Sequence, residues 1–174
     1  MAENNFSQIE ELRKSGWRPT IVICIIYEGK VLMAYRQEHD IWQLPQGGIE
    51  AGETPAQAFM RELEEEFGKE ASRTLEVDSD NLIFVGGDKL EFGRTSRQNL
   101  QIKEGQSNLL GKAYLAFAAA VKAAPNSFEG SQFKEHRFVS YQEGQDLAST
   151  INQTGKRKVT ENILNLLKSS NLIS

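Results

Sequence analysis

The chain has 174 residues, of which 39% are hydrophobic and 25% are charged, and its formal net charge at pH 7 is −4. This length and composition are typical of one globular domain that is soluble and has a core of its own. The acidic balance argues against broad electrostatic capture of nucleic acid, a lone Cys24 excludes a disulfide framework or a cysteine metal site, and no apolar run is long enough to span a bilayer.

Residues 1–16 are expected to be an N-terminal extension of a single domain that spans residues 17–174. Ile9 and Leu12 favour a short amphipathic helix in the extension, and a loose terminus is the alternative. Because this segment has acidic residues and no apolar signal core, we expect a cytoplasmic protein.

A β-branched apolar run over residues 20–27 predicts a buried strand. Glu28-Gly29-Lys30 then predicts a hairpin turn, and residues 31–36 predict the returning strand. A polar loop over residues 37–41 follows, and residues 42–46 lead the chain to Gly47.

The stretch from Gly47 to Gly68, GGIEAGETPAQAFMRELEEEFG, predicts a glycine-rich loop and then a short helix. Thr54 suits the N-cap, Pro55 the first helical position, and Gln57 completes a capping box. Gly68 offers a left-handed stop. Apolar side chains fall on one stripe at helical spacing: Ala56, Phe59, Met60, Leu63 and Phe67.

Three glutamates occupy a different face of this predicted helix. Glu62, Glu65 and Glu66 fall within about one quadrant of it. Like charges at this spacing destabilise a helix by roughly a few tenths of a kcal/mol per pair. A divalent cation such as Mg²⁺ would balance them, because it prefers oxygen ligands and keeps waters that substrate phosphates can replace. A solvated acidic face is the alternative, and most charge runs are of that kind.

The second half of the chain is less regular. Residues 69–79 are expected to be a polar connection, and residues 82–86 and 89–93 look like two strands around a Gly87-Asp88 turn. The polar stretch 94–111 is expected to be a substrate-facing or mobile loop. The remaining elements are predicted strands at 112–121 and 135–140 and predicted helices at 142–149 and 156–168. Together the elements predict an α/β fold in which one mixed sheet lies between helices.

The spacing of the glycine-rich loop and helix resembles the Nudix box, written G-x5-E-x7-R-E-U-x-E-E-x-G-U with U aliphatic. Eight of its nine specified positions match, and the ninth, normally aliphatic, is Lys69. The matching residues are Gly47, Glu53, Arg61, Glu62, Leu63, Glu65, Glu66 and Gly68. The resemblance implies the Nudix fold, a mixed sheet sandwiched between helices (α/β/α), and a hydrolase of nucleoside diphosphates linked to another moiety.

The resemblance also implies roles for the residues of the box. By analogy with the family, Glu62, Glu65 and Glu66 are metal ligands, and the Gly47 carbonyl adds a backbone oxygen. The implied cofactor is Mg²⁺ or Mn²⁺, with more than one ion when substrate is bound. Arg61 and Glu53 look like a supporting pair, in which an arginine fork holds the loop carboxylate. A plain helix-surface ion pair is the alternative for Arg61.

The acceptor of the water proton has several candidates. Glu65 or Glu66 could combine metal ligation with the role of base. Some family members recruit an acidic residue from a later loop, where Glu129 and Glu135 are the candidates in this chain. His136, beside the last predicted strand, is interpreted as structural.

Four fragments resemble the RNA 5′-pyrophosphohydrolases and their relatives, the dinucleoside polyphosphate hydrolases. These fragments are Trp17-Arg18-Pro19, Arg36, the run WQLPQGGI at residues 42–49, and Arg137-Phe138-Val139-Ser140. In the loop before Arg137, Gln132 stands where those relatives would offer a glutamate.

The substrate expected from this resemblance is a 5′-triphosphorylated RNA end or a dinucleoside polyphosphate. Arg18 and Arg36 could hold phosphates, because arginine offers a fixed fork of donors. Lys112 and Tyr114 could approach the polyphosphate and a base. The alternative is that both are ordinary strand residues and that Tyr114 is packed in the core.

Other functions stay open at this point. They are a nucleotide-sugar or nucleoside triphosphate pyrophosphatase, a non-catalytic nucleotide-binding module, and a helical interaction module built on the acidic helix. We expect no membrane association and no extended binding of nucleic acid, and the sequence does not indicate an oligomeric state.

Overall fold

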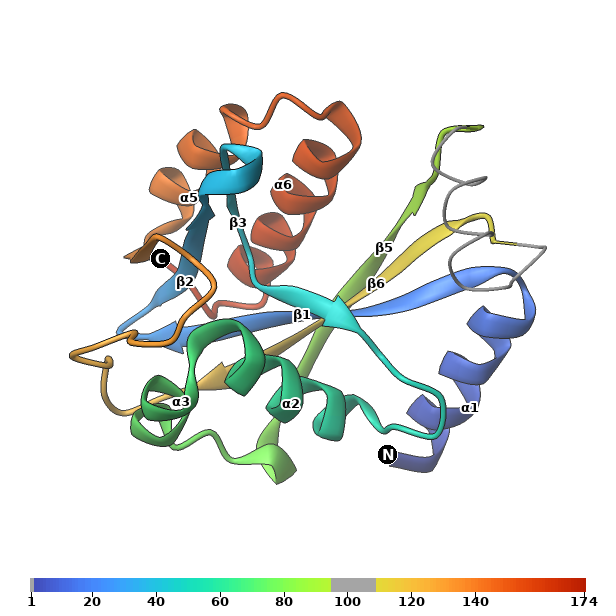
Figure 1. The fold of residues 1–174 in the computed structure, drawn as a ribbon, viewed down its shortest axis with the longest axis horizontal. Helices are drawn as coiled ribbons and strands as arrows, with labels where there is room; N and C mark the ends of the chain where they lie inside the picture. The colour runs from blue at the N-terminus through green and yellow to red at the C-terminus, as the bar shows by residue number, and fades with distance from the viewer. Residues whose placement is uncertain (1, 95–108) are drawn as a thin grey trace.

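A seven-stranded mixed β-sheet forms the centre of the computed structural model, which describes residues 2–94 and 109–174 (Figure 1). The main path of the sheet is β3-β2-β1-β6-β5, with β4 paired to β1 and β7 paired to β2. Strands β1 and β6 run parallel, and the other pairs are antiparallel. The strands are β1 (Trp17–Tyr27), β2 (Lys30–Arg36), β3 (Ile41–Gln43), β4 (Gln46–Gly48), β5 (Ile83–Glu91), β6 (Gly111–Ala120) and β7 (Glu135–Val139).

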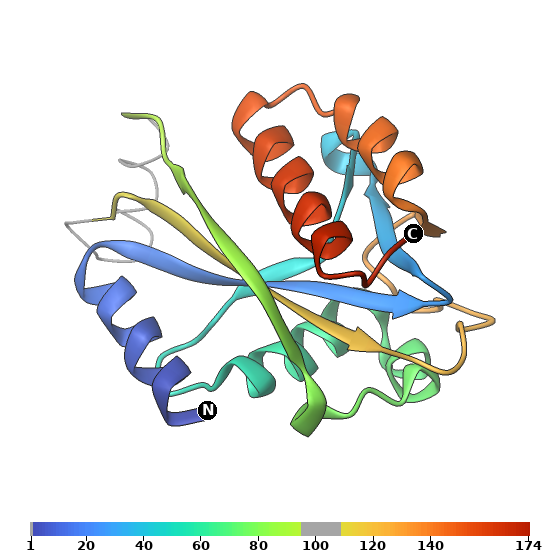
Figure 2. The ribbon, with the colours of Figure 1, turned by 180° about the vertical axis from the view of Figure 1, so that it is seen from behind.

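Helices cover both faces of this sheet, as the two opposite views show (Figures 1 and 2). One face carries α1 (Ala2–Lys14), α2 (Pro55–Phe67) and α3 (Lys69–Leu75). The other carries α5 (Tyr141–Ser149) and α6 (Thr154–Ser169). Two short 3₁₀ turns are η1 (Gln37–His39) and η2 (Ser79–Asn81). This layering confirms the predicted α/β class. None of the helices in the described residues is both long and apolar enough to cross a membrane.

Strand β1 is buried on both faces, which explains why its apolar run does not alternate with polar residues. Ile21, Ile23 and Ile25 pack in the core with α2 and α3. Val22, Cys24 and Ile26 pack in the core under α5 and α6. Burial raises the pKa of the Cys24 thiol to about 12, so the thiol is unreactive, as the sequence indicated.

Helix α2 has the bounds and the cap that its sequence predicts. The Thr54 hydroxyl accepts from the backbone N–H of Gln57, and the Gln57 side chain accepts from the backbone N–H of Thr54. Phe59, Leu63 and Phe67 are fully buried against the sheet. The cap and the apolar stripe therefore fix where the helix begins and which face it turns to solvent.

Two predictions for the chain after α2 are wrong. Residues 69–75 form α3 instead of a polar connection, because Ala71 and Leu75, four residues apart, bury the same face. Residues 83–91 form the single strand β5 instead of two strands around a turn. Gly87 and Asp88 pair with β6, and a bulge between Phe84 and Gly86 takes up the irregularity.

The N-terminal segment is helical, which agrees with the first of the two alternatives for residues 1–16. Ile9 of α1 is 2% exposed and joins the core on the α2 side of the sheet. The expectation of a loop over residues 94–111 lies mostly outside the described residues.

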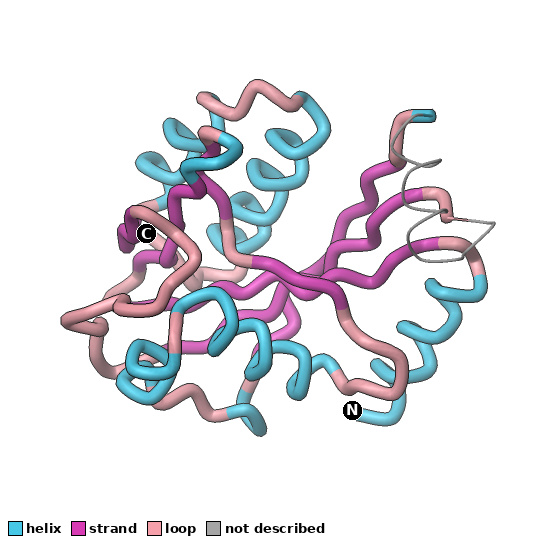
Figure 3. The backbone as a smooth tube through the Cα atoms, viewed as in Figure 1, coloured by secondary structure: helices cyan, strands magenta, loops and turns pink. Residues whose placement is uncertain are grey.

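Gly68 joins α2 to α3 with φ +87° and ψ 158°, which is a glycine conformation but not the left-handed helical stop that was predicted. A Cβ at this position would lie 2.4 Å from the backbone carbonyl oxygen of Glu129. The loop between β6 and β7 thus lies directly against the end of α2 (Figure 3).

We expect Gly68→Ala to lower the free energy of unfolding by about 2–4 kcal/mol, because it adds backbone strain and a clash with a rigid carbonyl. Gly52→Ala is the matched control: Gly52 also has a positive φ, +79°, but a Cβ there meets nothing within 4 Å. Gly52→Ala should lower the free energy of unfolding by only about 1–2 kcal/mol. Urea denaturation of both variants measures the difference, and equal losses would show that the contact with Glu129 contributes nothing.

Candidate active site

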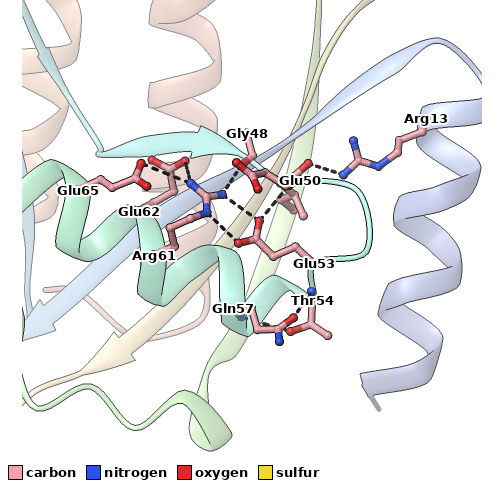
Figure 4. A network of polar contacts seen from close by, with 10 residues as sticks. Arg13, Gly48, Glu50, Glu53, Thr54, Gln57, Arg61, Glu62 and Glu65 are labelled. Carbon is pink, nitrogen blue, oxygen red and sulfur yellow. Dashed lines mark hydrogen bonds and ion pairs between the residues drawn. The ribbon is translucent and has the colours of Figure 1, made fainter.

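Arg61 lies at the centre of a polar network that joins α2 to the loop before it (Figure 4). Its Nε and Nη2 donate to the two carboxylate oxygens of Glu53, each at 2.8 Å. Nη2 also donates to the Gly48 carbonyl at 2.8 Å, and Nη1 donates to Glu62 at 2.6 Å and to Glu65 at 3.4 Å. The structure therefore brings Arg61 and Glu53 together as a two-pronged pair, and the pair fixes the loop on the helix.

Gly47 allows the carboxylate of Glu62 to lie against the backbone of β4. A Cβ on Gly47 would fall 1.8–2.0 Å from three atoms of that carboxylate group, so any other residue would force the Glu62 carboxylate to move. Glu62 is 7% exposed. Burial raises the pKa of its carboxyl, and the ion pair with Arg61 opposes that rise.

Glu66, one turn further along α2, pairs with Arg36 at the end of β2. The distance between Arg36 Nη2 and Glu66 Oε2 is 2.8 Å, and the Arg36 guanidinium lies 4.8 Å from the centre of the Phe133 ring. Burial outweighs the attraction of Arg36 and raises the pKa of the Glu66 carboxyl to about 7. Arg36, which was expected to contact phosphate, thus contacts a predicted metal ligand. Glu65 differs from Glu62 and Glu66 because half of its side chain is exposed.

The C-terminal end of α2 is held by the loop between β6 and β7. The Ser131 hydroxyl donates to the Glu66 carbonyl at 2.9 Å, and the backbone N–H of Gln132 donates to the same oxygen at 3.0 Å. The Gln132 side chain donates to the Glu65 carbonyl at 3.1 Å. Gln132 therefore binds the helix end through its side-chain amide as well as its backbone.

His136 supports this loop as a neutral, stacked side chain. Its ring stacks on Phe128 with centroids 3.8 Å apart, and burial lowers its pKa to about 4. Because the single Ser131 hydroxyl proton goes to the Glu66 carbonyl, the 2.7 Å contact with His136 requires Nε2 of the ring to donate. These contacts fit the structural interpretation of His136.

The two later acidic candidates have different surroundings. The Glu135 carboxylate lies 3.5 Å from Arg137 on the same strand. Glu129 is exposed, and its backbone carbonyl faces Gly68. Their role as proton acceptor stays a prediction, as do the roles of Glu65 and Glu66.

Two clefts meet at Arg18. The first, of about 380 Å³, is lined by α2 carboxylates and arginines, among them Glu62, Glu65 and Arg61. The second, of about 420 Å³, is lined by the end of β5 with Leu90 and Glu91, by β6 and by the N-terminal end of α6. Arg18 lines both.

The second cleft gathers three of the four predicted substrate contacts, Arg18, Lys112 and Tyr114, while Arg36 is not among its lining residues. Tyr114 is 2% exposed, and burial raises its pKa to about 12, so its hydroxyl stays protonated near neutral pH. Gln153 and Lys156 also line this cleft. Neither residue was predicted to belong to a site, because an amphipathic helix pattern does not say what the polar first turn of the helix faces.

The α2 carboxylates supply the oxygen donors that Mg²⁺ or Mn²⁺ prefers, and Glu62 and Glu66 are buried with raised pKa values. The pKa values are raised in spite of an ion pair with an arginine at each carboxylate. A further positive charge would stabilise the ionised forms, so the donor set fits a divalent cation. Within residues 2–94 and 109–174, no three His, Cys, Asp or Glu side chains converge as a metal site. Glu62 and Glu66 point instead to Arg61 and Arg36. Metal ligation by Gly47, Glu62, Glu65 and Glu66 therefore stays a prediction.

A family model and several curated relatives match this chain. A family model of the NUDIX domain matches residues 17–163. An RNA pyrophosphohydrolase of Sulfurovum sp. (strain NBC37-1) is 32% identical over 136 residues, which cover 75% of this chain and 82% of that protein. An RNA pyrophosphohydrolase of Halorhodospira halophila is 52% identical over 54 residues, 30% of each chain. The matched part of this chain thus spans about a third of the length of the first such relatives.

Solved structures agree with the fold. A NUDIX hydrolase from Nitrosomonas europaea matches with a TM-score of 0.61 at 14% identity, over 90% of this chain and 92% of that one. The E. coli dihydroneopterin triphosphate pyrophosphohydrolase matches with a TM-score of 0.57 at 18% identity. The match covers 86% of this chain and 97% of that one. At these identities the likeness shows a shared fold.

The raised pKa of Glu66 predicts how Glu66→Gln changes stability with pH in chelator. The folded protein binds the Glu66 proton more tightly than the unfolded chain, so wild-type stability falls as the pH rises from about 4.5 to about 7. The neutral glutamine removes that loss. Glu66→Gln should therefore raise the free energy of unfolding by about 1–3 kcal/mol at pH 8 and change it little at pH 4.5.

Urea titrations at the two pH values measure this effect. Glu64→Gln is the control, because Glu64 lies on the same helix with half of its side chain exposed. A Glu66→Gln protein that is less stable than wild type at pH 8 would contradict the prediction and would mean that the ion pair with Arg36 outweighs burial.

Proposed function

The chain belongs to the Nudix family, and we propose that it is a metal-dependent hydrolase of a phosphoanhydride bond in a nucleoside diphosphate-linked substrate. The observation that carries the proposal is the network around Arg61, which holds Glu53, Glu62 and Glu65 beside a cleft that also contains Arg18. Two of the carboxylates proposed to bind cations, Glu62 and Glu65, thus line one cleft with the arginine proposed to bind phosphate.

Mg²⁺ or Mn²⁺ would be held by Glu62, Glu65 and Glu66 with the Gly47 carbonyl, and more than one ion is expected with substrate. When bound, the metal supplies charge neutralisation on the phosphate oxygens and a more acidic water. The ion pair between Arg61 and Glu53 holds the loop against the helix and so keeps the proposed ligands in place. Among the three proposed metal ligands Glu65 has the most exposed side chain, which favours it as the group that takes up the water proton.

We place the phosphate chain at Arg18, between the two clefts, and the nucleoside in the cleft of Lys112 and Tyr114. Lys156 adds a positive charge to that cleft. The substrate we propose is a 5′-triphosphorylated RNA end or a dinucleoside polyphosphate. The sequence relatives named RNA pyrophosphohydrolase support the first of these.

The acidic net charge of −4 disfavours a grip on a long nucleic-acid backbone, so only the terminal nucleotides of an RNA should contribute to binding. A cytoplasmic location and the absence of membrane association remain part of the proposal.

Glu65→Gln is expected to lower kcat by at least about a hundredfold, because it removes the proposed proton acceptor. Circular dichroism should stay that of the wild type, since Glu65 lies away from the buried stripe of α2. A phosphate-release assay with Mg²⁺ measures the effect, and Glu64→Gln is the control.

The same assay in chelator tests the metal. Wild-type turnover should vanish and return on addition of Mg²⁺ or Mn²⁺, with an optimum on the alkaline side. Turnover that persists in chelator would exclude the metal mechanism, and wild-type turnover of Glu65→Gln would exclude Glu65 as the base.

A substrate panel tests the second part of the proposal. We expect kcat/KM to be highest for a short 5′-triphosphorylated RNA or for diadenosine tetraphosphate, and lower for a nucleotide sugar and for free nucleoside triphosphates. A tenfold preference corresponds to about 1.4 kcal/mol of transition-state binding. If the nucleotide sugar is preferred by that factor, the substrate assignment fails while the hydrolase assignment stands.

A further inference from the structure

Helix α1 precedes the segment that the family model matches, yet it lies beside the candidate active site. Its Ile9 is buried in the core on the α2 side of the sheet. One turn later, Nη2 of Arg13 donates a hydrogen bond to the carbonyl of Ile49, in the loop between β4 and α2. Figure 4 shows Arg13 reaching from α1 toward the loop segment that carries Glu50 and Glu53.

The contacts of Arg13 orient its guanidinium. Its Nε lies 3.2 Å from a Glu10 carboxylate oxygen, and 21% of the Arg13 side chain and 34% of the Glu10 side chain are exposed. A pair with this exposure is worth only about 0.2–1 kcal/mol, so Glu10 positions the charge more than it neutralises it. In the described part of the chain, Glu10 and Ile49 engage Nε and Nη2, which leaves Nη1 for a ligand.

Arg13 also lines the cleft that the α2 carboxylates line. The charged groups of this cleft are three arginines and three glutamates: Arg13, Arg18, Arg61, Glu50, Glu62 and Glu65. Arg61 is committed to glutamates and to the Gly48 carbonyl. A divalent cation on the glutamates would leave the cleft positive overall, which suits a chain of phosphates.

We propose that Arg13 is a specificity-determining residue that contacts the phosphate chain of the substrate on the α1 side of the cleft. Helix α1 would then set a preference for substrates with more phosphates, because longer chains reach further from the α2 carboxylates. This inference rests on the proposed function, since it places a phosphate chain in that cleft.

The test compares Arg13→Ala and Arg13→Lys with wild type on diadenosine tri-, tetra- and pentaphosphate in Mg²⁺. We expect Arg13→Ala to raise KM about three- to tenfold, most for the pentaphosphate, with kcat within about twofold. Arg13→Lys should recover most of the affinity, because a lysine still binds phosphate as a point charge. Arg73→Ala, an exposed arginine on α3 at the opposite end of α2, is the control and should match wild type (Figure 1).

A fall in kcat with unchanged KM, not restored by lysine, would show that Arg13 only tethers the loop at Ile49 and would overturn the proposal. An unchanged KM on all three substrates would overturn it as well. Thermal unfolding checks each variant. Arg13→Gln, which keeps an amide N–H and removes the charge, replaces the alanine variant if that variant is unfolded at the assay temperature.

Binding of inorganic tripolyphosphate in excess Mg²⁺, measured by calorimetry, separates this inference from the proposed function. If wild type hydrolyses neither the dinucleotides nor a 5′-triphosphorylated RNA, the proposed function fails, but weaker binding of tripolyphosphate to Arg13→Ala would still support the contact. A tenfold loss of affinity for tripolyphosphate corresponds to about 1.4 kcal/mol of binding free energy. Equal binding by wild type and Arg13→Ala would overturn the contact whatever the activity.

Discussion

The guanidinium of Arg61 joins helix α2 to the loop before it and to the end of β4. It binds both oxygens of Glu53 in the loop, the carbonyl of Gly48 at the end of β4, and the carboxylate of Glu62 on its own helix. These partners raise its pKa further, so the charge is permanent. Because three positions depend on one side chain, loss of Arg61 would leave partly buried carboxylates unpaired, which costs more than the pair itself contributes.

The arrangement of the α2 carboxylates has a cost in the metal-free protein. Glu62 and Glu66 are almost fully buried, and burial is the largest influence on both of their pKa values. A core made only for stability would place apolar side chains there. Shifted carboxylates of this kind are typical of functional sites. Arg61 and Arg36 limit the cost, and each does so by a contact of 2.8 Å or less.

Local sequence predicts the parts of the site that are close along the chain. Thr54 and Gln57 specify the start of α2, and the spacing from Gly47 to Gly68 specifies which carboxylates share a face. The parts that could not be predicted depend on contacts between distant segments. Ser131 reaches the Glu66 carbonyl across 65 residues. Gly87 and Asp88 favour a turn on their own, but pairing with β6 keeps them in a strand.

Strand β1 links the two clefts because it has different neighbours on its two edges. On one edge it pairs with β4, which places Thr20 and Ile21 opposite Gly48 and Gly47 and so sets the backbone under Glu62. On the other edge it runs parallel to β6, where Arg18 is opposite Lys112 and Thr20 is opposite Tyr114. A shift of one residue in either register would turn every side chain of the shifted strand to the other face. The register of this one strand therefore fixes the distance between the carboxylates and the residues proposed to hold the substrate.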